Sequence, residues 1–292
     1  MDGGQNSLAS VWEVDLPTPP ALGALLIGKP VAEVADTLPR LFNLCAAAQG
    51  MAARLSLGLP PIPHARTQLA REILRDHMLA LNVTLPRLAG LPIRALPDGW
   101  HNATDLAPAL WGGAPPDDLG AWLNSGLGLA PLVARVQALF ARGEGEAPAL
   151  PMVDAANVDA GPPVENSPAA RHAGRPLMQQ AEAMAGRGPL WRLLGRLCDT
   201  EAAARGTLPA PHLRACGMAL MPAARGVYAL RLTQEDGILQ AIRRITPTDH
   251  MLAPQGALRL ALNNLRNPAL APLLLALHDP CVPVTLRQVQ HA

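Results

Sequence analysis

The sequence has almost no net charge and few aromatic residues. Its 292 residues carry 24 basic and 23 acidic side chains, a formal net charge of +1, and aromatic residues make up only 3%. A nucleic-acid-binding surface usually needs a clustered excess of Lys and Arg, and a single-strand platform also needs aromatic rings on which bases stack. Both absences argue against a nucleic acid partner.

Long hydrophobic runs and targeting segments are also missing. The most apolar stretches, such as residues 269–277, are too short to span a bilayer. The first residues, MDGGQNSLAS, include an acid and no basic region of the kind that begins a signal peptide. We therefore expect a cytoplasmic protein without a membrane partner.

Cysteine is scarce, and the four cysteines are far apart. They are Cys45, Cys198, Cys216 and Cys281. No two have CxxC or CxH spacing, which excludes a self-contained zinc knuckle, and four free thiols are the default in a reducing cytoplasm. A lone cysteine on a helix, such as Cys45 or Cys198, is usually a small buried hydrophobe. We expect Cys216, next to a glycine, to be buried in a turn.

Cys281 has a different setting, because it follows Pro280 in a segment predicted to be extended. Proline fixes the backbone ahead of the cysteine, which suits a presented thiol. A packed C-terminal tail is the simpler interpretation of this segment taken alone.

Signatures of several enzyme classes are absent as well. The chain has no HExxH motif and no GxSxG elbow, and GLGLAP at 126–131 lacks the Lys-Ser/Thr of a phosphate loop. His77 lies on a strongly periodic apolar helix, which is more typical of a core histidine than of a ligand. No reaction follows from these motifs.

Helical periodicity is the main positive signal, and apolar residues make up 49% of the chain, enough for a substantial core. We expect helices over residues 40–57, from 67 to a stop at Pro86, within 125–142, and over 177–205 and 255–278. Residues 143–176, rich in Gly, Pro, Asn and Asp, are expected to cross the fold as an irregular segment. Asp236-Gly237 between apolar runs predicts a β-hairpin. The predicted fold is mainly α (α+β), a helix bundle with one small hairpin, in a single domain over 1–292.

Two cysteine segments resemble the metal-binding motifs of the large subunit of nickel–iron hydrogenases. That family carries an N-terminal RxCGxCxxxH motif and a C-terminal DPCxxCxxH motif, whose cysteines hold nickel and iron. In RLFNLCAAAQ at 40–49, Cys45 matches the second cysteine of the first motif. Phe42 stands in place of the first cysteine and Gln49 in place of the histidine.

The C-terminal motif reads DPCVPVTLR, and here Cys281 matches the first cysteine. Val284 replaces the second cysteine and Arg287 the histidine. Before residue 40 we find no counterpart of the family's RIEGH segment. Only five residues follow Arg287, so we expect no cleaved extension of the kind that catalytic precursors carry.

Intervening segments support the resemblance in the same order, from about residue 35 onward. REILRDHMLALNVTLPRLAGLP is similar to the family helix after the first motif, with His77 matching a helix histidine, and NSPAARHAGRPLMQQ is similar to a later segment. MPAARGVYALRLTQEDGILQAIRRITPT resembles the family's EAPRG loop and hairpin. In the family an arginine and hydroxyl groups of this region surround the cyanide ligands of iron. Arg225 and Thr248 match those positions.

This combination resembles the HupK-type hydrogenase expression/formation proteins, degenerate relatives of the large subunit. The resemblance implies a large-subunit-like fold, no catalysis, no stable nickel–iron centre, and maturation chaperones and the hydrogenase large subunit as partners. One hypothesis is a scaffold in which Cys45 and Cys281 transiently hold an iron–cyanide/carbonyl unit, assisted by Arg225 and Thr248. The alternative is a metal-free chaperone or interaction platform in which the cysteines are relics. A hydrogenase-like enzyme with a single metal is a third, less favoured hypothesis.

Overall fold

The computed structural model describes residues 11–18, 20–42 and 44–289. The first ten residues, from which we expect no signal segment, lie outside this description, as does Asn43 of the first motif. The helices are α1 (Leu22–Leu26), α2 (Val31–Thr37), α3 (Ala46–Ser56), α4 (Ala65–Leu79), α5 (Leu85–Leu88), α6 (Ala107–Trp111), α7 (Leu119–Leu123), α8 (Ala130–Leu139), α9 (Pro168–His172), α10 (Pro176–Ala185), α11 (Pro189–Arg205), α12 (Pro247–Leu252), α13 (Ala257–Asn263) and α14 (Ala271–His278). The strands are β1 (Val11–Asp15), β2 (His212–Leu213), β3 (Ala219–Ala223), β4 (Gly226–Glu235), β5 (Ile238–Ile245) and β6 (Thr285–Val289).

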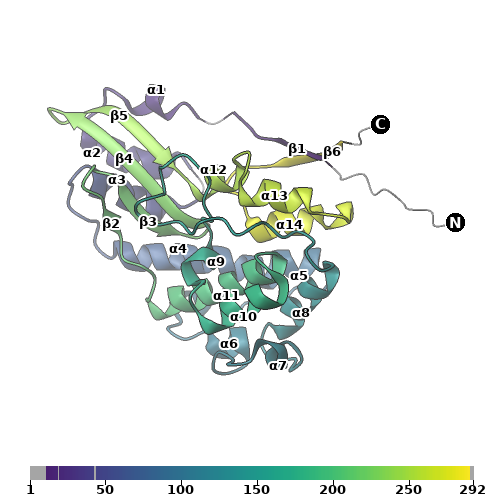
Figure 1. Ribbon diagram of the computed structural model, residues 1–292. Coiled ribbons are helices and arrows are strands. Elements are labelled where there is room, and N and C mark those ends of the chain that lie inside the picture. Colours follow the sequence, from purple (N-terminus) through teal and green to yellow (C-terminus); the bar gives the residue numbers. More distant parts are fainter. Residues whose placement is uncertain (1–10, 19, 43, 290–292) are drawn as a thin grey trace.

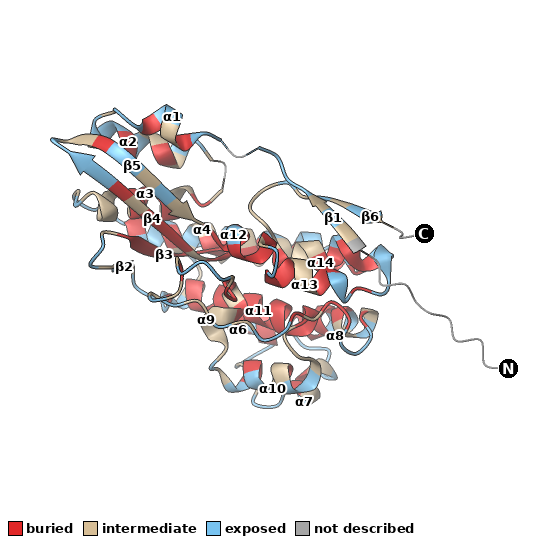
Figure 2. Cartoon of the chain, turned by 45° about the horizontal axis from the view of Figure 1, so that its top comes forward, coloured by how far each residue is buried: buried red, intermediate tan, exposed pale blue. Residues whose placement is uncertain are grey.

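Helix α11 is the centre of the fold. Its residues are buried almost without a break, and it packs against α4, α8, α9, α10 and α14 (Figure 2). Gly195 makes the closest of these packings possible, because a Cβ there would lie 2.3 Å from Cα of Ala169 on α9. Helix thus predominates over strand, 47% against 14% of the residues, and the predicted mixed but mainly helical fold is confirmed.

A four-stranded antiparallel sheet, in the order β2-β3-β4-β5, lies at one end of the helices, and α3 packs against β3 and β4 (Figure 1). The predicted hairpin joins β4 and β5 through Asp236 and Gly237, whose φ angles are 50° and 77°. Two consecutive positive φ angles give the turn that matches the twist of paired strands, and Gly adopts them at little cost. The hairpin prediction is confirmed.

The prediction that Pro86 ends its helix was wrong. A π-helical turn, η2 (Ala80–Thr84), follows α4, and the chain continues through Pro86 to Leu88. In an α-helix the proline ring would clash with the carbonyl four residues earlier, at Asn82, and could not donate to it. The wider turn avoids this clash, and Arg94 N donates to that carbonyl instead, at 2.8 Å.

Other predicted helices begin late or are interrupted, each for a local reason. The helix over 40–57 begins only at Ala46, because Cys45 has a left-handed backbone with φ 57°. The helix over 177–205 is split into α10 and α11 by Gly186, at φ 62°, and by Pro189, which begins α11. The helix over 255–278 is split into α13 and α14 by a short 3-10 turn that starts at Pro268. The helix within 125–142 is present as α8.

Residues 143–176 consist of turns, the short helix α9 and isolated bridges at Ala147 and Met152. In the part of the chain that the structure describes, no helix is long and apolar enough to cross a membrane.

A second sheet pairs β1 with β6, antiparallel, from Val11↔Val289 to Asp15↔Thr285. The sequence did not predict this pairing of the two ends of the described chain. We also expected Pro280 to force an extended chain. Asp279 instead has a left-handed backbone, with φ 52° and ψ 60°, and the regular strand starts only at Thr285.

Candidate functional site

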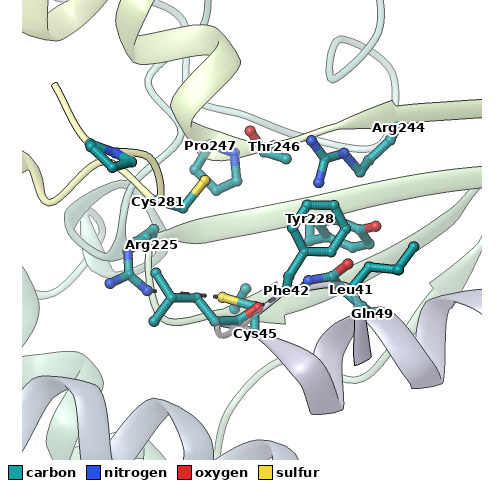
Figure 3. Close-up of a pocket in the computed structure, with 13 residues that line it drawn as sticks. Leu41, Phe42, Cys45, Gln49, Arg225, Tyr228, Arg244, Thr246, Pro247 and Cys281 are labelled. Carbon is teal, nitrogen blue, oxygen red and sulfur yellow. Dashed lines mark hydrogen bonds between the residues drawn. The ribbon is translucent and has the colours of Figure 1, made fainter. Parts of the chain in front are cut away.

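Cys45, Cys281 and Arg225 line one cavity of about 340 Å³ (Figure 3). The loop before α3, the β3–β4 turn, the end of β5 and the segment after α14 form its walls. The two sulfurs lie on opposite sides of the cavity, and Arg225 lies between them at one end. The fold therefore brings together three of the four predicted site residues from distant parts of the chain.

Cys45 is the residue that precedes the first turn of α3, and its side chain is buried. Glu72 on α4 caps this helix end by accepting from Ala47 N at 2.8 Å. Burial raises the pKa of the Cys45 thiol to about 12, against the opposing effect of the Arg225 guanidinium. The thiol is therefore neutral at physiological pH, and a metal bound there must displace its proton.

Cys281 is half-buried and is fixed by Thr248, the fourth predicted residue. The Thr248 hydroxyl donates to Cys281 Sγ at 3.0 Å and accepts from Cys281 N at 2.9 Å. Thr248 is itself held in the first turn of α12, where Thr246 and Asp249 form a capping box. Thr248 and Cys281 also line a neighbouring cavity of about 350 Å³.

Arg225 lies in the two-residue turn between β3 and β4 and is tied on several sides. Its Nε donates to Asp279 O at 2.9 Å, Nη2 to Asp279 Oδ1 at 3.3 Å, and Nη1 to Asp76 Oδ2 at 3.0 Å. The same Nη1 lies 4.0 Å from Cys45 Sγ. Burial lowers the pKa of Arg225, but the carboxylates of Asp279 and Asp76 outweigh it and raise that pKa overall, so the guanidinium stays charged.

Asn166, just before α9, holds the β3–β4 turn in place. Gly226 has φ 138°, and a Cβ there would lie 2.3 Å from Asn166 Oδ1. Asn166 Oδ1 accepts from Val227 N at 2.6 Å, and its amide donates to Val227 O at 3.0 Å. Arg225 is thus carried by a rigid turn.

Asp279 of the DPC segment connects the cavity to the core. Its Oδ2 accepts from Arg196 of α11 at 3.2 Å, while Oδ1 faces Arg225. Burial raises the pKa of Asp279, but Arg196 and Arg225 outweigh this effect and hold the pKa below its ordinary value. The carboxylate therefore stays charged and fixes both guanidinium groups.

The positions where the family's motifs have their other two cysteines and their two histidines hold other side chains here. The Arg244 guanidinium stacks on the Phe42 ring, 4.7 Å from its centroid. Gln49 is buried and its Nε2 donates to Leu44 O at 3.0 Å. Val284 packs on the core, and Arg287 points to β1, 2.7 Å from Asp15 Oδ2. Within residues 11–18, 20–42 and 44–289, no group of three or more Cys, His, Asp or Glu side chains is arranged to hold a metal.

The remaining cysteines and His77 lie outside the cavity. Cys198 is fully buried on α11, as predicted. The prediction for Cys216 was wrong, because it is exposed in the tight turn between β2 and β3, beyond the core. His77 is a core histidine, as predicted, with Nε2 2.8 Å from Asp199 Oδ2.

Three functional candidates were missed from the sequence: Asp76, Arg244 and Tyr228. Asp76 meets Arg225 across 149 positions of the chain, and no motif marks it. Arg244 and Tyr228 line the cavity from neighbouring strands. A signal did exist for Tyr228, since it is the single tyrosine of the chain and lies in the strand directly after Arg225.

Comparison with known proteins adds a relative and a fold. No family model matches the chain. The hydrogenase expression/formation protein HupK of Rhodobacter capsulatus is 49% identical over 279 residues, which cover 94% of this chain and 92% of that protein. The Ni-Fe-Se hydrogenase of D. vulgaris Hildenborough superposes with a TM-score of 0.57 at 12% identity, over 94% of this chain and 96% of that chain. The Ni-Fe-Se hydrogenase of Desulfomicrobium baculatum gives 0.54 at 12% identity, over 94% and 97%. These structures show a shared fold, and the predicted hydrogenase large-subunit-like architecture is confirmed.

Proposed function

We propose that this chain, which belongs to the family of the hydrogenase expression/formation protein HupK, is a non-catalytic accessory protein of nickel–iron hydrogenase maturation. In this proposal it is a scaffold whose cargo is an iron unit that bears cyanide and carbonyl ligands. Its partners would be maturation chaperones and the hydrogenase large subunit. The work would take place in the cytoplasm, where thiols stay reduced.

One observation supports the scaffold above all others. A thiol from each end of the chain, Cys45 and Cys281, lines the same cavity, with a charged arginine held between them. Thiolates are soft ligands suited to iron. Two thiolates are an incomplete set, and an incomplete set binds less tightly, which suits a cargo that must be passed on.

Arg225 has one donor left for such a cargo. A guanidinium has five N–H groups. Three of them donate to Asp76 and Asp279, and the second N–H of Nη1 is directed at Cys45 Sγ, which leaves one N–H group, on Nη2. A charge-assisted bond from this group to a cyanide nitrogen would orient the unit. The Thr248 hydroxyl, now donating to Cys281 Sγ, could turn to a ligand of iron once that sulfur is occupied.

The test is iron analysis and infrared spectroscopy of the chain, purified without oxygen from a host that matures hydrogenase. We expect iron together with cyanide and carbonyl bands, and loss of both in Cys45→Ser and Cys281→Ser. Cys216→Ser is the matched control, because it removes an exposed thiol outside the cavity. Absence of iron and bands, with normal hydrogenase maturation by the Cys45 and Cys281 variants, would overturn the scaffold.

A metal-free interaction platform is the second candidate, and the neutral thiol of Cys45 favours it. In that case the chain would present a large-subunit-like surface to maturation factors. Two results together would support the platform. The Cys45→Ser/Cys281→Ser double variant captures such factors as well as the wild type does, and the wild type contains no iron. Neither candidate includes catalysis, so hydrogen-dependent dye reduction by the purified chain should be at background.

A further inference from the structure

The side of the cavity away from Arg225 contains a cation without a counter-ion. Arg244, near the end of β5, lines the cavity with its guanidinium stacked on Phe42. Unlike that of Arg225, its guanidinium makes no ion pair or hydrogen bond with any of the described residues. Stacking on a ring leaves the edge N–H groups of a guanidinium available. A half-buried positive charge in this setting favours an anion beside it.

Two buried polar atoms on the same side also lack partners. The Tyr228 hydroxyl and Gln49 Oε1 find none within the described part of the chain, although each residue is only 3% exposed. Gln49 Nε2 is fixed by its bond to Leu44 O, and this bond assigns the orientation of the amide. Buried polar groups in folded proteins are almost always paired, so these two unpaired atoms, in residues that line the cavity, indicate a partner that the described residues do not supply.

The three groups form a complementary set. Arg244 and Tyr228 offer N–H and O–H donors, and Gln49 offers one acceptor. The planar fork of a guanidinium matches the planar pair of oxygens in a carboxylate. A ligand that satisfies all three groups is a small planar oxyanion with one donor of its own, as in hydrogencarbonate. At about 340 Å³ the cavity admits it together with several waters.

We infer that Arg244, Tyr228 and Gln49 form a binding site for a small planar oxyanion of the carboxylate or hydrogencarbonate class, beside the two thiols. The site requires no iron, so it goes beyond the scaffold and does not depend on it.

Titration calorimetry of the full chain, free of metal and at constant ionic strength, tests the site. The probes are hydrogencarbonate, formate, acetate and phosphate. We expect the planar anions to bind, with hydrogencarbonate tightest because it is the one planar probe that can donate to Gln49. Arg244→Gln should weaken binding at least about tenfold, the size of one lost charge-assisted bond. Arg244→Lys, which keeps the charge and loses the fork, should be intermediate.

Tyr228→Phe keeps the test valid if Arg244→Gln fails to fold. It removes one hydroxyl that has no partner in the described structure, so its melting temperature should not fall while its affinity for hydrogencarbonate drops several-fold. Arg243→Gln is the matched control, because Arg243 is the exposed neighbour on β5 and lies 3.9 Å from Asp159. Its affinity should be unchanged.

Three results would overturn the inference. The first is no binding of any planar anion at millimolar concentration. The second is binding that Arg244→Gln and Tyr228→Phe leave unaltered. The third is phosphate binding more tightly than every planar anion, which would contradict the planar class. Failure of the iron scaffold would change none of these measurements, so the two proposals are tested separately.

Discussion

Asp279→Asn isolates the electrostatic support of the cavity from its backbone. Asp279 has φ 52°, a left-handed conformation that Asn tolerates at least as well as Asp. The substitution therefore removes the negative charge without disturbing the chain. That charge lies between Arg196 and Arg225, at 3.2 Å and 3.3 Å.

The expected loss of unfolding free energy depends on which arginine loses its only counter-ion. Among the described residues Arg196, with a side chain 3% exposed, has Asp279 as its single ion-pair partner. Arg225 keeps Asp76. Breaking a buried pair from one side costs about 3–5 kcal/mol. The Asn amide oxygen can still accept one bond, so we expect a loss near the lower end, about 3 kcal/mol of unfolding free energy.

Urea unfolding followed by circular dichroism measures this loss, and its pH dependence gives a second check. The folded-state pKa of Asp279 lies below the ordinary 3.8, so its stabilisation is complete above that pH and is lost as pH falls through the lowered pKa. The difference between wild type and Asp279→Asn should therefore be full at neutral pH and shrink in acid.

Asp236→Asn is the matched control, because Asp236 is exposed and has the same left-handed backbone, with φ 50°. We expect it to change stability by no more than about 0.5 kcal/mol. In an Arg196→Met background, Asp279→Asn should cost about 1 kcal/mol or less of unfolding free energy, because the buried charge of Arg196 is no longer there to be left unpaired. Equal stability of the Asp279 and Asp236 variants, or full additivity with Arg196→Met, would refute the reasoning.

Three further outcomes follow from other buried groups of the molecule. Burial holds the pKa of His278 well below 6.5, so below that pH only the unfolded state gains the proton and the folded state loses stability. In His278→Leu the unfolding free energy, measured in urea, should therefore fall less steeply below pH 6.5, by about 1.4 kcal/mol per pH unit. A thiol reagent at pH 8 should modify exposed Cys216 rapidly and Cys45 slowly, since a thiol of pKa about 12 is only about 10⁻⁴ thiolate there; equal rates by peptide mass spectrometry would contradict the burial. Gly195→Ala should cost about 3 kcal/mol or more in thermal unfolding despite the better helix propensity of Ala, whereas Gly174→Ala, with nothing within 4 Å, should be near neutral.

Local patterns predicted local structure well. The hairpin at Asp236-Gly237 and the amphipathic helix around His77 depend on neighbours in sequence, and both are present. The pairing of β1 with β6 joins segments from opposite ends of the described chain, and nothing local in either segment marks its partner. The break at Gly186 had a local signal, but helical periodicity on both sides concealed it.

The site residues show the same division between local signals and contacts of distant segments. A resemblance in short motifs was enough to single out Cys45, Cys281 and Arg225, which line one cavity. The ion pair of Asp76 with Arg225 and the stacking of Arg244 on Phe42 are contacts between distant segments. Such contacts exist only once the sheet and α4 have packed, so no spacing in the sequence encodes them.

The pairing of β1 with β6 also sets a time at which the cavity can form. The segment after β1, including Leu16 and Pro17, lines the neighbouring cavity together with Cys281. Strand β6 starts four residues after Cys281 and pairs with β1, which is synthesised some 270 residues earlier. During synthesis, therefore, β1 has no β6 to pair with until nearly all of the described chain has left the ribosome. Of the residues that line the cavity between the two thiols, only Pro283 is synthesised after Cys281, so a ligand held by both thiols can be loaded only when nearly all of the described chain has been made.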